Sequence, residues 1–364
     1  MKSFRCDNCG NLVFFQNDVC VKCSLPLGFL PDLLELSSLK PLPENRFQAL
    51  TPRAGERAYR HCANGPQFRV CNWMVAEEDS NAFCVACRLN EVIPALTDLK
   101  NRERWRKLEL AKRRCLYTFL KLGLPLESND ASNQPPMRFR FLQDLSHSQV
   151  KTGHQNGVIT LNIAEADEDE RERRRLMLQE TYRTLVGHIR HESGHFYWDR
   201  LISYSPHLPR FRELFGDESI NYDLALQTYY QQGPPPGWQN RTVTAYASSH
   251  PWEDWAESWA HYLHIVDVVE TAANFGVSVN PDNAPSQSAQ TAVPVLFSEP
   301  MEFEQLMASL GPLTCALNSI NRGMGLPDVY PFIIPPAVTE KLRFIHEVIH
   351  AGPPKSPVTP DENR

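Results

Sequence analysis

The sequence has 364 residues, which is long enough for two or three domains with a sizeable core. A hydrophobic share of 42% is ordinary for a globular protein, and a net charge of −6 argues against a surface that binds nucleic acid throughout. We see no run long enough to span a membrane and no apolar secretory signal, so we expect a cytoplasmic protein without a membrane partner. Cysteines in that compartment stay reduced and bind metal more often than they form disulfides.

Two Cys-x-x-Cys pairs lie near the start of the chain, with ten residues between them. Each pair directs two thiolates at one point, and two pairs complete the tetrahedral coordination of a structural zinc ion. A module of this size cannot bury much apolar surface. Metal binding would therefore supply most of its folding free energy. The sequence therefore predicts a zinc ribbon with four ligands: Cys6, Cys9, Cys20 and Cys23.

A second cysteine group predicts a second structural zinc site. Eight residues separate its first two members, an unusual spacing that makes this prediction weaker than the first. The pairing stays open, because a cross-braced arrangement would use the same eight cysteines of the two groups. The second group consists of Cys62, Cys71, Cys84 and Cys87.

The stretch 101–122 predicts a helix, because apolar side chains recur there at spacings of three and four residues. The opposite face is basic, with nine Lys and Arg side chains between residues 100 and 121. This face could contact phosphate or an acidic partner, or it could be an ordinary solvated helix face. We favour the solvated face and expect no nucleic-acid partner, because aromatic side chains for base stacking are missing between the charges.

A polar stretch after this helix predicts a domain boundary. We expect a zinc-ribbon domain with the basic helix at 1–126, a linker at 127–136, a second domain at 137–351 and a disordered tail at 352–364. Alternating apolar residues predict strands at 137–141 and 158–163. The second strand could lie at a sheet edge and align an extended substrate.

The second domain carries a His-Glu-x-x-His motif within a stretch of clear helical periodicity. His191 and His195 are four residues apart, so they lie one helical turn apart and can bind one metal ion. The carboxylate of Glu192 can then reach a water on that metal. In zinc peptidases with this motif the metal activates the water and the glutamate takes its proton.

Gly194 lies inside the same motif. A glycine in a helix costs about 1 kcal/mol relative to alanine, so a close approach of backbone or ligand usually explains it. Two explanations for a glycine at this position are equally good: ordinary helix–helix packing, or the close approach of a ligand at a metal site.

A third protein ligand is expected, because catalytic zinc normally takes three and keeps one position open. The stretch 250–264 predicts a helix that places Glu253, Glu257 and His261 on one stripe. We choose Glu253 as ligand, with Glu257 holding a ligand histidine by a hydrogen bond, although the two could be exchanged. Asp217 and Glu218 are weaker rivals.

Tyr246 lies seven residues before Glu253. Its hydroxyl could donate a hydrogen bond to the oxyanion that develops when water attacks a carbonyl group. Ordinary packing is the alternative for this side chain. His188, His261 and His264 are expected to be wall or core histidines.

These motifs resemble a bacterial family of zinc-binding metallopeptidases that carry an N-terminal zinc-ribbon domain. The resemblance covers most of the chain and implies a ribbon module followed by a gluzincin-like peptidase domain. The stretches that carry it include Cys71-Asn-Trp-Met, Phe83-Cys-Val-Ala-Cys-Arg-Leu-Asn90, Ala111-Lys-Arg-Arg114, His191-Glu-Ser-Gly-His-Phe-Tyr-Trp198 and His250-Pro-Trp-Glu-Asp.

A more distant similarity concerns the Tyr246…Glu253-x-x-Ala-Glu257 spacing. It resembles the catalytic domain of anthrax-lethal-factor-type peptidases, which implies Tyr246 as oxyanion donor and Glu253 as third ligand.

We therefore expect an α+β protein, with zinc-ribbon modules followed by a mainly helical zincin-like domain that contains a small sheet. The expected activity is zinc-dependent hydrolysis of peptide bonds in a peptide or protein substrate, with one catalytic and two structural zinc ions. The alternative is a non-catalytic scaffold whose ribbons bind a protein or nucleic-acid partner and whose second domain keeps a metal for stability.

Overall fold

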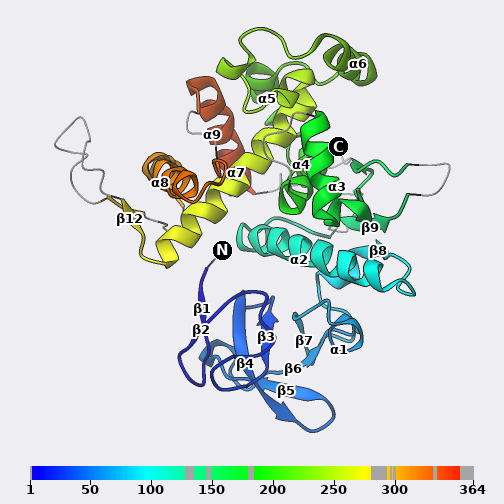
Figure 1. Cartoon of the computed structure of the whole chain (residues 1–364), viewed down its shortest axis with the longest axis vertical. Coiled ribbons are helices and arrows are strands. Elements are labelled where there is room, and N and C mark those ends of the chain that lie inside the picture. Colours follow the sequence, from blue (N-terminus) through cyan, green and yellow to red (C-terminus); the bar gives the residue numbers. More distant parts are fainter. Residues whose placement is uncertain are drawn as a thin grey trace, which may run out of the picture.

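The computed structural model describes residues 2–127, 135–144, 149–178, 184–279, 293–295, 297, 301–330 and 334–352. Most of the predicted linker and of the predicted tail lie outside these residues. Strands dominate the N-terminal part, helices dominate the C-terminal part, and the long helix α2 (Leu99–Lys121) runs between them (Figure 1). This arrangement confirms the predicted α+β class.

The N-terminal part contains an antiparallel sheet that the cysteine spacing did not predict. Its five strands are neighbours in sequence order: β3 (Leu27–Leu30), β4 (Glu35–Leu42), β5 (Arg46–Ala49), β6 (Ala58–His61) and β7 (Met74–Ala76). An isolated bridge between Phe29 and Trp73 brings the two ends of this sheet together. A smaller antiparallel sheet pairs β1 (Phe4–Arg5) with β2 (Leu12–Val13), and a short helix, α1 (Asn64–Phe68), precedes β7.

A mixed sheet joins the two parts of the molecule. Its strands run in the order β10 (Gly153–Gln155), β11 (Val158–Asn162), β9 (Arg138–Leu142) and β8 (Asn90–Val92). The strands predicted from alternation are β9 and β11, and they pair in parallel with Val158 opposite Arg138. The expectation that 158–163 forms an edge was wrong: the turn at Asn156 and Gly157 folds β10 back onto it, so β10 is the edge strand.

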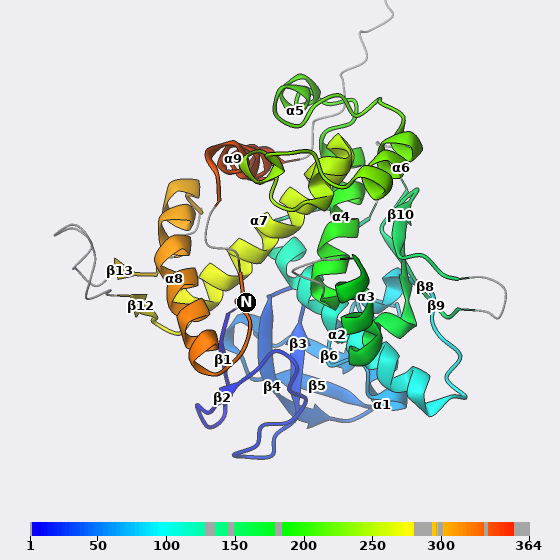
Figure 2. The same ribbon diagram turned by 45° about the horizontal axis from the view of Figure 1, so that its top comes forward.

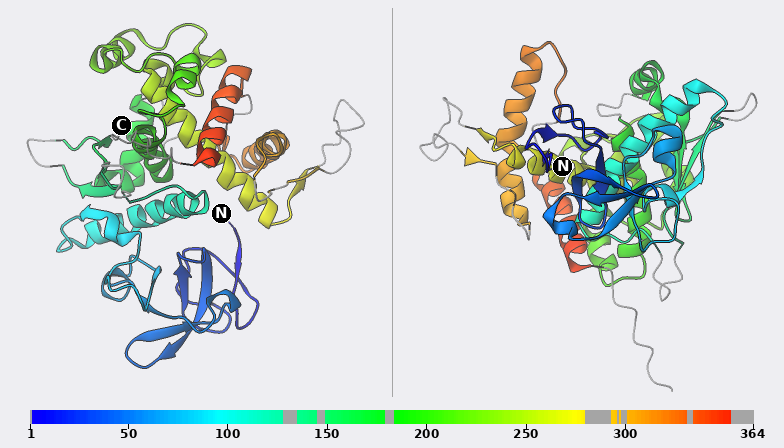
Figure 3. Two further views of the ribbon diagram at one scale, coloured as in Figure 1. Left: turned by 180° about the vertical axis from the view of Figure 1, so that it is seen from behind. Right: turned by 90° about the horizontal axis from the view of Figure 1, so that it is seen from below.

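The remaining helices build most of the C-terminal part. α4 and α7 pack against each other, and α8 and α9 pack against α7 (Figures 2 and 3). A short hairpin of β12 (Ser278–Val279) and β13 (Val293–Pro294) follows α7. The helices are α3 (Glu168–Leu178), α4 (Leu185–Leu201), α5 (Leu208–Phe215), α6 (Tyr222–Gln232), α7 (Pro251–Asn274), α8 (Phe303–Gly323) and α9 (Pro336–Ala351).

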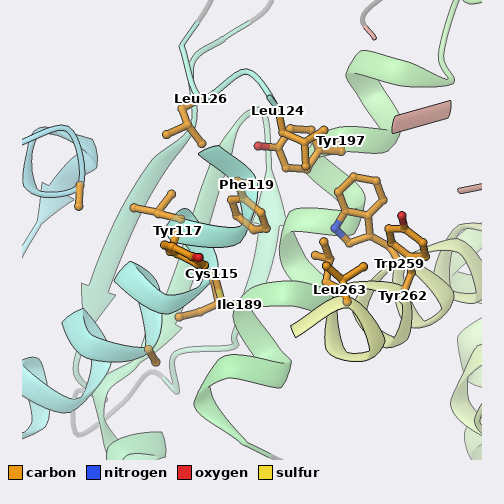
Figure 4. Packing of buried hydrophobic residues seen from close by; sticks show 14 of the residues in the cluster. Cys115, Tyr117, Phe119, Leu124, Leu126, Ile189, Tyr197, Trp259, Tyr262 and Leu263 are labelled. Atoms are coloured by element: carbon orange, nitrogen blue, oxygen red, sulfur yellow. The ribbon is translucent and has the colours of Figure 1, made fainter. Parts of the chain in front are cut away.

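Helix α2 contributes to the packing on both of its sides. The ring of Tyr117 lies 5.9 Å from that of Phe15 in the N-terminal part. The ring of Phe119 lies 5.5 Å from that of Tyr197, which in turn packs on Trp259 at 5.0 Å (Figure 4). One hydrophobic core therefore runs through both parts, and the predicted boundaries at 126 and 136 stay a prediction.

The basic face of α2 is only partly solvated, which corrects the sequence interpretation. Lys112 is fully buried and Arg113 is 4% exposed. The Lys112 amine lies 2.8 Å from the buried Glu109 carboxylate and also donates to Asn90. Helical periodicity identified the two faces, but the charged side chains have partners in segments that pack over that face from both parts of the chain. These partners are Val70, Asn90, Asp167 and Glu270.

Candidate functional site

The first cysteine group comes together at one point. Its four sulfur atoms lie within 4.8 Å of one another, with 3.6 Å from Cys6 to Cys23 and from Cys9 to Cys20. Each pair lies in a tight turn, closed by hydrogen bonds from Gly10 N to Cys6 O and from Ser24 N to Cys20 O. The turns aim both thiols of each pair inward, as a tetrahedral zinc site requires.

The second cysteine group also converges, and its four sulfur atoms lie within 4.8 Å of one another. The unusual spacing between Cys62 and Cys71 is explained by α1, which fills the connection and ends at Arg69 with a left-handed φ of 57°. The two groups are sequential, so the cross-braced pairing that the sequence left open does not occur.

A buried cation stands beside the second cysteine group. Burial alone would lower the pKa of Arg113, but the nearby Cys71 thiolate and Glu109 carboxylate outweigh it and raise the pKa. The guanidinium also donates to the carbonyl of Val70, one residue before Cys71. This positive charge offsets part of the negative charge that four thiolates would place there.

The third group joins the two histidines of the motif to a carboxylate from a distant helix. His191 and His195 lie on α4, whose first turn is capped by Thr184 accepting from Gly187 N at 2.9 Å. Glu253 lies in the first turn of α7, 3.1 Å from His191 Nε2 and 3.5 Å from His195 Nε2. The three ligand atoms lie within 4.8 Å of one another, which suits a single metal ion.

Close packing of two helices sets this geometry. A Cβ atom added to Gly194 would lie 2.8 Å from Cα of Ala256, so only glycine lets α4 and α7 approach this closely. The indole of Trp255 donates to the carbonyl of Gly194 at 2.9 Å and ties the helices together. Of the two explanations for Gly194, helix–helix packing is the one that applies, and the same packing brings Glu253 to the histidines.

Glu257 lies one turn further along α7 and contacts the other side of His191. Its Oε1 atom is 2.6 Å from His191 Nδ1, and its Oε2 atom accepts from Thr244 at 2.7 Å. A carboxylate in this place fixes the ring orientation and the tautomer of a metal-binding histidine. Glu257 is therefore found where a supporting hydrogen bond was expected, whereas Glu253 is the member of the three-residue group.

Two further predicted residues border the three-residue group. Glu192 is 8% exposed, and burial raises its pKa although both neighbouring histidines oppose this. Tyr246 lies in the 3-10 helix η5 (Tyr246–Ser249), and its ring centre is 6.1 Å from that of His191. Burial raises the pKa of Tyr246 well above its ordinary value, so its hydroxyl stays protonated as a donor.

The weaker rivals, Asp217 and Glu218, lie in other surroundings, and so does His261, which was expected to be a wall or core histidine. Glu218 pairs with Arg212 at 2.5 Å, and Asp217 accepts hydrogen bonds from Ser219. His261 contacts the hydroxyl of Tyr330 at 2.7 Å. None of them belongs to a metal-sized group of His, Cys, Asp or Glu within the described residues.

Sequence reasoning missed several residues that surround the group. The Tyr222 hydroxyl donates to Glu253 Oε1 at 2.6 Å, and the Trp252 ring centre lies 4.0 Å from that of His195. His154, on edge strand β10, stacks 6.4 Å from His195. Tyr222 and His154 lie far from the motif in sequence, so no spacing pattern could have found them.

The buried carboxylate provides a test of whether a cation fits. Glu253 is 1% exposed, and its Oε2 atom has no hydrogen-bond donor among the residues that the structure describes. An unpartnered carboxylate oxygen is costly to bury. The histidine and carboxylate donors are those that zinc accepts in catalytic sites, so the residues fit this metal.

Comparison with protein families identifies the chain. A model of the family described as "Putative zinc-binding metallo-peptidase" matches residues 101–348. The chain belongs to this metallopeptidase family. A zinc-ribbon domain model matches residues 3–98, so the N-terminal cysteine groups belong to a zinc-ribbon region, as predicted.

The chain has relatives along nearly its whole length. Uncharacterized proteins of Mycobacterium tuberculosis and Mycobacterium bovis are each 42% identical to it over 350 residues, which cover 96% of this chain and 95% of theirs. No solved structure matches. Within the described residues, none of the helices has the length and apolar character needed to cross a membrane.

Proposed function

We propose that the protein hydrolyses peptide bonds with one zinc ion bound by His191, His195 and Glu253. The convergence of these three ligand atoms within 4.8 Å, beside a buried Glu192, is the observation that carries this proposal. Three protein ligands leave a fourth position for water or substrate, as in other catalytic zinc sites.

The residues around the three proposed zinc ligands have different roles in the proposed reaction. A zinc ion held by these residues would lower the pKa of water from about 15.7 to about 7 and would polarise the substrate carbonyl. Glu192 takes the proton of the attacking water and later passes it to the leaving amine, a role typically worth about 10² to 10⁴ in rate. Tyr246, protonated because it is buried, donates a hydrogen bond to the carbonyl oxygen as negative charge develops.

Two further zinc ions would be structural, one in each cysteine group. This role is supported by the four converging sulfur atoms of each group, since four thiolates fill the coordination sphere and leave no open position. We also propose a cytoplasmic location. The ten free cysteines of the structure suit a reducing compartment, where thiolates remain available to metal.

Measuring zinc content and cleavage of a peptide library with the Glu192→Gln variant tests the proposal. We expect about three zinc ions per chain in both proteins. Cleavage by the variant should fall by about 10² or more, because glutamine cannot take the proton. Unchanged turnover in Glu192→Gln would overturn the mechanism, and wild-type protein with full zinc but no cleavage would favour the scaffold alternative.

A further inference from the structure

The two oxygen atoms of the Glu253 carboxylate have different surroundings. Oε1 accepts a hydrogen bond from the Tyr222 hydroxyl at 2.6 Å and lies 3.5 Å from His195 Nε2. Oε2 lies 3.1 Å from His191 Nε2 and has no hydrogen-bond donor among the described residues. Because Glu253 is 1% exposed, bulk water has almost no access to either atom. Protein groups therefore determine which oxygen remains available.

Tyr222 reaches the carboxylate from a helix at the surface. It is the first residue of α6, and the side chain of Asn221 caps this helix by accepting a hydrogen bond from Leu224 N at 2.9 Å. α6 has no buried residue, so little apolar packing fixes it in place. The Tyr222 ring lies 5.1 Å from that of His250 and 5.9 Å from that of Trp252, the residues that precede Glu253 at the start of α7.

We infer that Tyr222 is a positioning residue that makes Glu253 a ligand through Oε2 alone. The inference rests on the proposed metal site. A hydrogen bond from a hydroxyl to a carboxylate is charge-assisted and strong. It engages Oε1, so Oε2, which accepts no such bond, is the better metal ligand although both oxygens face a ligand histidine. Two-oxygen coordination by Glu253 would raise the number of protein ligand atoms from three to four, the number that fills a tetrahedral site. Outer partners of this kind typically contribute about 10- to 100-fold to metal affinity.

Three variants separate the hydroxyl of Tyr222 from its ring. Tyr222→Phe removes the hydroxyl and keeps the ring contacts with His250 and Trp252, whereas Tyr222→Ala removes both. Tyr230→Phe is the matched control, because Tyr230 lies on the same helix and is 63% exposed. The third site is the proposed zinc site of His191, His195 and Glu253. A His195→Ala protein, which lacks one of its ligands, serves as the reference without this site.

The affinity of the third site for zinc is measured by chelator competition on the full chain. The zinc-binding step that is missing in His195→Ala is assigned to the third site. A cooperative urea-unfolding transition like that of the wild-type protein confirms that each variant is folded. We expect the third-site affinity to fall by about 10-fold or more in Tyr222→Phe and in Tyr222→Ala, and to stay unchanged in Tyr230→Phe.

The outcomes distinguish this inference from the proposed function. Wild-type affinity in Tyr222→Phe with loss only in Tyr222→Ala would mean that the ring packs and the hydroxyl does not act, which overturns the inference. A lower affinity in Tyr222→Phe supports the inference even if no peptide is cleaved. Wild-type protein without a third zinc ion would overturn both.

Discussion

Gly194 offers the sharpest test of how the candidate site is assembled. Alanine at this position would place its Cβ 2.8 Å from Cα of Ala256 and 3.3 Å from that residue's carbonyl oxygen. Both contacts are with backbone, so they cannot be relieved by a side-chain rotation. Either α4 and α7 move apart or the contact stays strained, and the first of these separates the histidines from Glu253.

The expected change in the free energy of unfolding of Gly194→Ala is the sum of two opposing effects. Alanine favours a helix by about 1 kcal/mol over glycine. Overpacking a well-packed interior typically costs about 1–3 kcal/mol. Gly194→Ala should therefore lower the free energy of unfolding by up to about 2 kcal/mol, although helix propensity alone predicts a gain of about 1 kcal/mol.

Gly323→Ala is the matched control. Gly323 is the last residue of helix α8, and a Cβ atom there would meet nothing within 4 Å. This variant should gain up to about 1 kcal/mol. Urea unfolding of both variants measures the difference, and chelator competition for the third zinc ion reports the spacing of the ligands. Equal gains in stability with unchanged zinc affinity would refute the role of close packing at Gly194.

Two further predictions concern charged side chains. Glu257→Gln should lower the zinc affinity of the third site by about 10-fold while keeping the metal count, because His191 loses a charged partner; complete loss of that zinc would instead make Glu257 the ligand. Lys112→Met should cost up to about 3–5 kcal/mol in urea unfolding, because the buried Glu109 loses the cation 2.8 Å away and keeps Arg113 at the longer distance of 3.8 Å. The double variant Lys112→Met with Glu109→Gln should cost clearly less than the single one, and an equal cost would contradict the pairing.

Local spacing accounts for what the sequence predicted well. The cysteine pairs, the two histidines one helical turn apart and the stripe that contains Glu253 all depend on contacts within a few residues, where backbone geometry fixes the direction of the side chains. The strand predicted at 137–141 was confirmed by β9 for the same reason, because five alternating residues suffice to mark its faces.

The features that the sequence did not predict depend on contacts between segments that are far apart in the chain. β10 has three residues, too few for an alternating pattern, so the edge of the mixed sheet was misplaced. The Tyr222–Glu253 bond joins residues 31 positions apart, and their proximity depends on how α6 folds back over the start of α7. The burial of Lys112 likewise depends on which part of the chain covers the basic face of α2.

The position of Arg113 links the zinc-ribbon region to the helix that supports the candidate active site. Its buried charge is offset by thiolates, and cysteine thiols remain deprotonated at neutral pH mainly while metal is bound. Metal loss from the second cysteine group would leave a buried guanidinium with fewer counter-charges, which is costly. Two residues further along α2, Cys115 contacts the backbone of Val186 in α4 at 3.6 Å. Helix α2 therefore contacts both the second cysteine group, through Arg113, and helix α4, through Cys115. A shift of α2 after metal loss from the cysteine group would change the packing of the helix that carries His191 and His195.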